Sequence, residues 1–275
     1  MALPQAKLFR AFRPRDAPTA LRYFRFPLCA RLPASGLMEL QAGKLYIIAT
    51  PIGNLGDITE RARATLAAVD TVACEDTRHS GVLLQHIGVR KPLISVHEHN
   101  EASRSVQLIG ELQQGRTVAY ISDAGMPGVS DPGQRLVNAC IRAGVPVEVV
   151  PGPSAVTTAI IGSGFPADAF FFGGFLPVKS GQRERALTRA IEREETTVFF
   201  ESPHRIDGTL ALLARLAPGH RICVARELTK KFEEYRRGTA AEVCVHYAAH
   251  PAKGEMCLVI SGTDLPKWAQ PPAAE

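Results

Sequence analysis

Between residues 44 and 151, short apolar runs alternate with longer segments of helical spacing, and this alternation limits the possible folds more than any other feature. The apolar runs have the length of a buried strand. Strands that alternate with helices form βαβ units, so we predict an open, mostly parallel sheet of about five strands. The runs lie at 45–49, 71–74, 93–96, 117–121 and 147–150, and the helical segments at 58–69, 77–86, 101–114 and 133–143. Asn100 and either Asp131 or Pro132 are the start signals of the last two helices.

A Gly/Pro-rich passage at 162–177 interrupts this pattern and predicts a connection to a second α/β domain, with a cleft at the junction. Aromatic strands beyond it favour a mixed sheet. The predicted strands are 170–172, 197–200, 221–225 and 256–260, and the predicted helices 182–194, 205–216 and 240–250. The resulting division is a basic leader at 1–43, an N-terminal domain at 44–161, a C-terminal domain at 162–262 and a tail at 263–275.

The positive charge is concentrated in the first residues. Residues 1–38 carry a charge of +6 while the whole chain carries +5, which leaves −1 for the remainder. Charge therefore gives little support to a nucleic-acid-binding body. Three interpretations of the leader stay open: a targeting peptide, a disordered basic arm, or upstream sequence translated before a start at Met38.

The cysteines predict a reduced, cytoplasmic setting. The six of them are scattered without a Cys-x-x-Cys pair, which suggests neither a disulfide framework nor a zinc site. His97 and His99 have metal-like spacing but no evident third ligand, so we expect no metal. No apolar run approaches the roughly 18 residues that would span a bilayer.

Three loops at the carboxyl ends of the predicted strands are the candidate ligand-binding segments, because open parallel sheets bind ligands at that edge. They follow the first, fourth and fifth strands, at 49–57, 122–133 and 151–155, and are rich in Gly, Pro and Asp. Such residues make tight turns that bring backbone groups close to a ligand. The chain lacks the Gly-rich signatures of NAD and ATP sites at these positions, so another small ligand is expected.

The motifs in these loops resemble the tetrapyrrole methylase superfamily, and within it the enzymes that methylate a ribose of small-subunit ribosomal RNA. The resemblance covers about residues 44–262. Met126, Gly128 and Val129 depart from the family's pattern. The motifs that carry it are Ala49-Thr-Pro-Ile-Gly-Asn-Leu-Gly-Asp-Ile-Thr59, Cys74-Glu-Asp-Thr-Arg78, Ser122-Asp-Ala-Gly-Met-Pro-Gly-Val-Ser-Asp-Pro-Gly133, Pro151-Gly-Pro-Ser-Ala155, Gly174-Phe-Leu-Pro177, Glu201-Ser-Pro-His-Arg205 and Arg226-Glu-Leu-Thr-Lys-Lys231.

This resemblance implies an enzyme that binds S-adenosylmethionine in the cleft and methylates the 2′-hydroxyl of a cytidine in the decoding centre of 16S ribosomal RNA. It also implies a homodimer. The cofactor-binding residues carried over by motif, all in the N-terminal domain, are Pro51, Gly53, Ser122, Asp123, Ala124, Gly125, Pro127, Ser154 and Ala155.

Because a ribose hydroxyl is nearly unionised at neutral pH, a base or a stabilising cation should assist transfer. We expect Glu201 or Asp123 to assist the proton, while Glu75, Asp76 and Glu227 are further candidates. The alternative for Glu201 is that it caps the following helix or pairs with Arg205. The side chains expected to hold RNA phosphate or stabilise charge are Arg78, His204, Arg205, Lys230 and Lys231.

Two rival functions stay open. A methylase of a small tetrapyrrole would share the cofactor loops but should have a roomy apolar trough for the macrocycle. A non-catalytic RNA-binding protein of ribosome assembly would bind RNA without transferring a methyl group.

Overall fold

The computed structural model describes residues 40–263 and 265. Residues 1–39 of the leader and nearly all of the tail lie outside this part of the chain, so the interpretations of the leader stay predictions. Among the described residues, no helix combines the length and the apolar character that a bilayer span requires.

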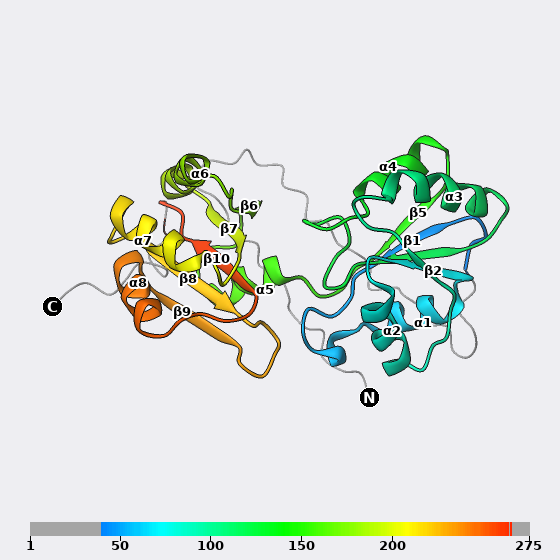
Figure 1. Ribbon diagram of the computed structural model, residues 1–275, viewed down its shortest axis with the longest axis horizontal. Coiled ribbons are helices and arrows are strands. Elements are labelled where there is room, and N and C mark those ends of the chain that lie inside the picture. The colour runs from blue at the N-terminus through cyan, green and yellow to red at the C-terminus, as the bar shows by residue number, and fades with distance from the viewer. Residues whose placement is uncertain (1–39, 264, 266–275) are drawn as a thin grey trace, which may run out of the picture. The chain divides into compact units, whose positions relative to one another are not determined.

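The first sheet contains five parallel strands in the order β3-β2-β4-β1-β5, as the alternation predicts (Figure 1). Its strands are β1 Leu45–Ile48, β2 Thr71–Cys74, β3 Leu93–Ser95, β4 Val118–Ile121 and β5 Val147–Val150. The segments that connect them are the 3-10 turn η1 Leu55–Asp57 and the helices α1 Glu60–Ala68, α2 Thr77–His86, α3 Glu101–Gln113 and α4 Gln134–Arg142.

Helices cover both faces of this sheet. Alternate strand residues point to opposite faces, so Tyr46 and Ile48 pack with α1 and α2 while Leu45 and Ile47 pack with α3 and α4. The strand order explains this division. After β1 the chain moves toward the β3 edge, and after β4 it moves toward the β5 edge. The connections therefore diverge between β1 and β4, which lie side by side, and ligands bind at such a switch point in open α/β sheets.

The second sheet is mixed, as the sequence predicts, with the strand order β6-β7-β10-β8-β9. β6 and β7 run parallel, and the remaining neighbours are antiparallel. Its strands are β6 Phe170–Phe175, β7 Thr196–Glu201, β8 Arg221–Arg226, β9 Glu234–Thr239 and β10 Met256–Ile260, and its helices are α5 Ala155–Ser163, α6 Ser180–Glu192, α7 Ile206–Leu216 and α8 Ala240–Ala249.

Helices α6, α7 and α8 cover one face of the second sheet, and α5 covers the other. Sequence spacing predicted neither α5 nor β9. The predicted start of α4 also needs a correction. Neither Asp131 nor Pro132 caps it, because Gly133 is the N-cap residue and a carboxylate from α3 binds the first N–H groups. The division of the chain into domains at 161 and 262 stays a prediction.

Candidate active site

The loops after β1 and β4 are fastened to each other at the switch point. Thr50 and Gly125 exchange two backbone hydrogen bonds, of 2.8 and 3.1 Å, and the Thr50 hydroxyl donates to the carbonyl of Ser122 at 3.1 Å. Gly125 has a φ of +76°, which disfavours any residue with a side chain, and a Cβ there would lie 3.4 Å from Ile52. These bonds fix the two loops to each other at the switch point.

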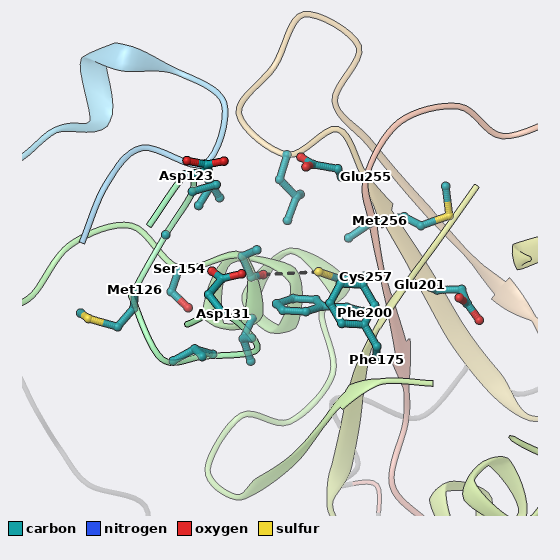
Figure 2. Close-up of a pocket in the computed structure, with 18 of the residues that line it drawn as sticks. Asp123, Met126, Asp131, Ser154, Phe175, Phe200, Glu201, Glu255, Met256 and Cys257 are labelled. Atoms are coloured by element: carbon teal, nitrogen blue, oxygen red, sulfur yellow. Dashed lines mark hydrogen bonds between the residues drawn. The ribbon is translucent and has the colours of Figure 1, made fainter. Parts of the chain in front are cut away.

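These loops border a pocket of about 490 Å³, the size of a small-molecule site (Figure 2). Residues from both sheets and their loops line it. Apolar side chains form much of the wall, and the ring of Phe200 packs edge-on against Phe172 and Phe175, with ring centroids 5.0 and 5.3 Å apart. The acidic side chains among the lining residues are Glu75, Asp123, Asp131, Glu201 and Glu255.

The expected cofactor-binding residues separate into three groups. Asp123, Ala124, Gly125, Ser154 and Ala155 line this pocket. Pro51 and Ser122 instead line a small hollow of about 30 Å³ that shares Asp123 with it.

The third group, Gly53 and Pro127, lies outside both linings. Gly53 serves loop packing, because a Cβ there would lie 2.5 Å from Lys230 Cγ and 3.0 Å from the Leu228 carbonyl oxygen. It therefore allows the loop after β1 to approach the loop after β8.

Sequence reasoning missed the apolar walls and Asp131. Phe175 and Phe200 lie on strands whose aromatic residues look like ordinary core, and Leu228, Met256 and Cys257 come from the far end of the chain. Only tertiary structure brings such residues to one pocket. Asp131 did stand in a ligand-loop motif, but its position before a helix favoured a capping role.

The electrostatics of the pocket favour a cation. Burial, followed by repulsion from Asp123, raises the pKa of Glu75. Burial, followed by repulsion from Glu75, Asp123 and Glu255, raises the pKa of Asp131 to about 6. A positively charged ligand would relieve this repulsion.

Glu201 makes the contacts of a structural residue. Its side chain is fully buried and pairs with Arg205 Nη2 at 2.5 Å. It also accepts hydrogen bonds from the Thr209 hydroxyl and the Ser202 N–H, each at 2.8 Å. Figure 2 shows its carboxylate directed away from the other labelled pocket residues. This geometry corresponds to the helix-capping and pairing alternative.

The Asp76–Arg78 pair is also engaged locally. Asp76 caps helix α2 by accepting from the Arg78 N–H at 2.8 Å, and its carboxylate pairs with the Arg78 guanidinium at 2.7 Å. These contacts hold the pKa of Asp76 well below its usual range. The Arg78 side chain nevertheless remains 90% exposed and can reach another anion.

The expected RNA-binding side chains differ in availability. His204 and Lys231 are exposed. Arg205 is held by Glu201 and by the carbonyl of Leu176, to which it donates at 3.0 Å. Lys230 bridges Glu227 and Glu255, at 3.0 and 2.8 Å.

The residues present fit S-adenosylmethionine, which carries a sulfonium and an amino group. The acids suit these cations, the aromatic wall suits an apolar ring, and the volume is adequate. Ser154 precedes α5 without capping it by its side chain, so its hydroxyl and the first N–H groups of α5 can bind polar ligand atoms.

Comparison with known proteins identifies the family. A family model described as "Tetrapyrrole (Corrin/Porphyrin) Methylases" matches residues 44–244. Two solved structures share the fold. One is a uroporphyrin-III-C-methyltransferase from Thermus thermophilus, with a TM-score of 0.58 and 23% identity over 82% of this chain and 100% of the other. The second is the cobalamin-biosynthetic cobalt precorrin-4 methyltransferase, with a TM-score of 0.59 and 16% identity over 84% and 97%.

Curated relatives are much more similar in sequence. Ribosomal RNA small subunit methyltransferase I of Mesorhizobium japonicum is 51% identical over 78% of this chain and 74% of its own length. The Synechocystis protein of the same name is 46% identical over 83% of each chain. The Thermotoga maritima protein is 44% identical over 81% of this chain and 100% of its own length. The switch-point pocket and these relatives together show that the chain belongs to the ribosomal RNA small subunit methyltransferase I family of the tetrapyrrole methylases.

Proposed function

We propose that this protein transfers a methyl group from S-adenosylmethionine to the 2′-hydroxyl of a cytidine in the decoding centre of 16S ribosomal RNA. The observation that carries the proposal is the acidic, aromatic-walled pocket at the switch point, in a chain 44 to 51% identical to curated small-subunit RNA methyltransferases. The bound cofactor supplies an electrophilic methyl group on a positively charged sulfur. The protein has to orient the hydroxyl and exclude water.

The walls of the pocket support this task. Phe175 and Phe200 contribute apolar rings to the lining, and Gly125, Ser154 and Ala155 contribute backbone and small side chains. In this proposal Asp123 contacts the bound cofactor or the ribose. Glu201 acts indirectly, by holding Arg205 and the start of α7 in place. The residues that shape the cofactor loops from outside the main pocket are Pro51, Gly53, Ser122 and Pro127.

An RNA substrate also needs a surface outside the pocket. Arg78, His204 and Lys231 are exposed cationic or titratable side chains. The neighbouring Phe232 is 63% exposed, and the Lys231 ammonium lies 5.5 Å from the centroid of its ring. Unpaired RNA bases stack on such aromatic rings. We propose that Lys231 and Phe232 contact RNA near the target nucleotide, whereas Arg205 and Lys230 support the structure around it.

The first experiment measures transfer from isotopically labelled S-adenosylmethionine to small ribosomal subunits that lack the modification, followed by nucleoside analysis. We expect label in 2′-O-methylcytidine. Subunits that already carry the modification are the matched control and should accept little label. Protein-free 16S RNA tested beside them distinguishes an assembled subunit from naked RNA as the substrate.

The rival functions predict other results. Label in a porphyrin precursor such as uroporphyrinogen III, with none in RNA, would establish the tetrapyrrole alternative. Salt-dependent RNA binding without any transfer would establish a non-catalytic assembly protein. A homodimer and a cytoplasmic location are further parts of the proposal, and sedimentation of the purified chain and cell fractionation test them.

A further inference from the structure

Asp131 is a pocket carboxylate without a partner among the described residues. Glu75 also has no ion pair in this part of the chain, but His97 and the backbone of Asp123 both act to lower its pKa, whereas the charged groups that act on Asp131 are all acids. Glu201 is bound by Arg205 and Thr209, and Glu255 pairs with Lys230. Asp123 accepts the Asp76 N–H at 3.3 Å. Across the described part of the chain, no hydrogen bond or ion pair engages the carboxylate of Asp131, which lines the pocket and is only partly exposed.

A second carboxylate explains why Asp131 is free. Asp131 lies three residues before Gln134, the first residue of α4, where a carboxylate would ordinarily be attracted to the N–H groups at the start of the helix. Here Glu101 binds those groups from α3. Its buried Oε1 accepts from Gly133, Arg135 and Leu136 at 2.9, 3.1 and 3.2 Å. The N-terminus of α4 is therefore satisfied, and the Asp131 carboxylate remains available to the pocket.

The backbone immediately before Asp131 is strained. Ser130, immediately before it, has a φ of 65°, a left-handed conformation that costs energy in a residue other than glycine. The charged groups that act on Asp131 are Glu75, Asp123 and Glu255, all of them acids. Unpaired, strained and repelled groups are retained where they serve binding or catalysis.

The chemistry of the reaction requires a group of this kind. As the hydroxyl oxygen bonds to the methyl carbon, the carbon–sulfur bond breaks and its electron pair stays on sulfur. The oxygen then carries a proton that must leave. A desolvated carboxylate holds a proton better than an ordinary aspartate does, because burial disfavours its charged form. At a pKa of about 6, Asp131 is still ionised at neutral pH and can accept that proton.

We propose that the Asp131 carboxylate is the general base that accepts the proton of the attacking ribose hydroxyl and later releases it to water. This inference rests on the proposed function, because it takes the hydroxyl as the methyl acceptor. Asp131 is then a catalytic residue. The other pocket acids, Asp123 and Glu75, bind the cationic ligand and maintain the proton affinity of Asp131 by repulsion.

The test compares single-turnover methyl transfer by the unaltered chain and by Asp131→Asn, both saturated with S-adenosylmethionine and small subunits. We expect the rate to fall by about 10²-fold or more, the usual contribution of a general base. Cofactor affinity, measured by calorimetry, should weaken by no more than about tenfold, since one partly exposed charge is lost. Asp168→Asn, which removes an exposed carboxylate outside the pocket lining, is the matched control and should leave the rate unchanged.

The pH profile separates a base from a structural residue. In the unaltered chain the rate should rise with pH and level off above about pH 6. A bound cation lowers the pKa of Asp131, so the plateau then begins at a lower pH. Without the base, Asp131→Asn should lose the plateau, because hydroxide must then remove the proton. Asp131→Ser is measured in parallel, so that the conclusion does not depend on the folding of one variant.

Three results would overturn the proposal. One is near-normal single-turnover transfer by a folded, cofactor-saturated Asp131→Asn. Another is a rate loss that higher cofactor concentration fully restores, which would make Asp131 a binding residue. The third is a plateau that survives in Asp131→Asn and disappears in Asp123→Asn, which would assign the proton to Asp123. Absence of transfer by the unaltered chain would instead reject the proposed function itself.

Discussion

At the scale of single residues, Asp131 and Glu201 show how surroundings assign roles to similar carboxylates. Both line the same pocket. Glu201 has a cation and two further donors, so its charge is neutralised and its position fixed. The charged groups that act on Asp131 are all acids. The sequence placed Glu201 in a conspicuous motif and Asp131 in front of a helix, and our proposal assigns the catalytic role to Asp131 because its carboxylate is the less engaged of the two.

Asp131 should destabilise the fold when it is ionised. Its pKa in the folded chain, about 6, lies above the ordinary value of 3.8. A raised pKa means that the folded state binds the proton more tightly, so stability is lost as pH rises from about 4 through about 6. The advantage of Asp131→Asn over the unaltered chain in the free energy of unfolding should therefore grow from pH 5 to pH 7 and then remain constant.

Urea unfolding at several pH values measures this advantage. Asp168→Asn provides the comparison, because its carboxylate is exposed and outside the pocket lining. A difference between Asp131→Asn and the unaltered chain that does not vary with pH would contradict the expectation.

At the scale of elements, helix α4 depends on a cap from another helix. Glu101 is 4% exposed and binds three N–H groups at the start of α4. Glu101→Ala would leave buried donors without an acceptor, and we expect it to lower the free energy of unfolding by about 1–3 kcal/mol. It should also weaken S-adenosylmethionine binding, because the loop before α4 forms part of the pocket.

Chemical unfolding and calorimetry measure the two effects of Glu101→Ala. Gln107→Ala, on the exposed face of the same helix, should change stability by less than about 0.5 kcal/mol. Unchanged stability of Glu101→Ala would show that water or another group replaces the cap.

The two elements that the sequence patterns did not predict, α5 and β9, pack against each other. Helix α5 contains Thr157, Thr158 and Gly162, which are poor helix formers, and its apolar residues lack a one-sided pattern. Strand β9 reads Glu-Tyr-Arg-Arg-Gly-Thr, and charged residues are common on the edge strand that it forms. A Cβ at Gly162 would lie 2.0 Å from the Tyr235 ring, so the glycine is required by this contact.

At the scale of the whole molecule, the pocket joins residues that are far apart in the chain. Asp123 and Ser154 come from loops of the first sheet, and Phe200 and Met256 from strands of the second. A ligand that contacts both groups binds only the folded chain. It therefore stabilises the fold by RT ln(1 + [L]/Kd), about 2.7 kcal/mol at one hundred times Kd.

We expect S-adenosylhomocysteine to raise the unfolding temperature in a concentration-dependent manner, because it fills the same pocket without a transferable methyl group. Differential scanning calorimetry measures the shift. Adenosine alone, which lacks the amino-acid part, should produce a smaller one. An unfolding temperature unaffected by saturating S-adenosylhomocysteine would contradict the assignment of the pocket.

The sequence by itself determined the parallel first sheet, the mixed second sheet, and the loops after β1 and β4 that border the pocket. These features depend on local periodicity and on turn-forming residues, which are visible within a short window of the chain. The motifs also indicated the family. Tertiary structure alone decided that α5 is a helix, that Glu201 is engaged by Arg205, and that Asp131 is left without a partner. The helix α5 and the free carboxylate of Asp131 depend on contacts with residues remote in sequence, which spacing along the chain does not encode. The Glu201–Arg205 pair was one of two alternatives that the four-residue spacing allowed, and the folded contacts decided between them.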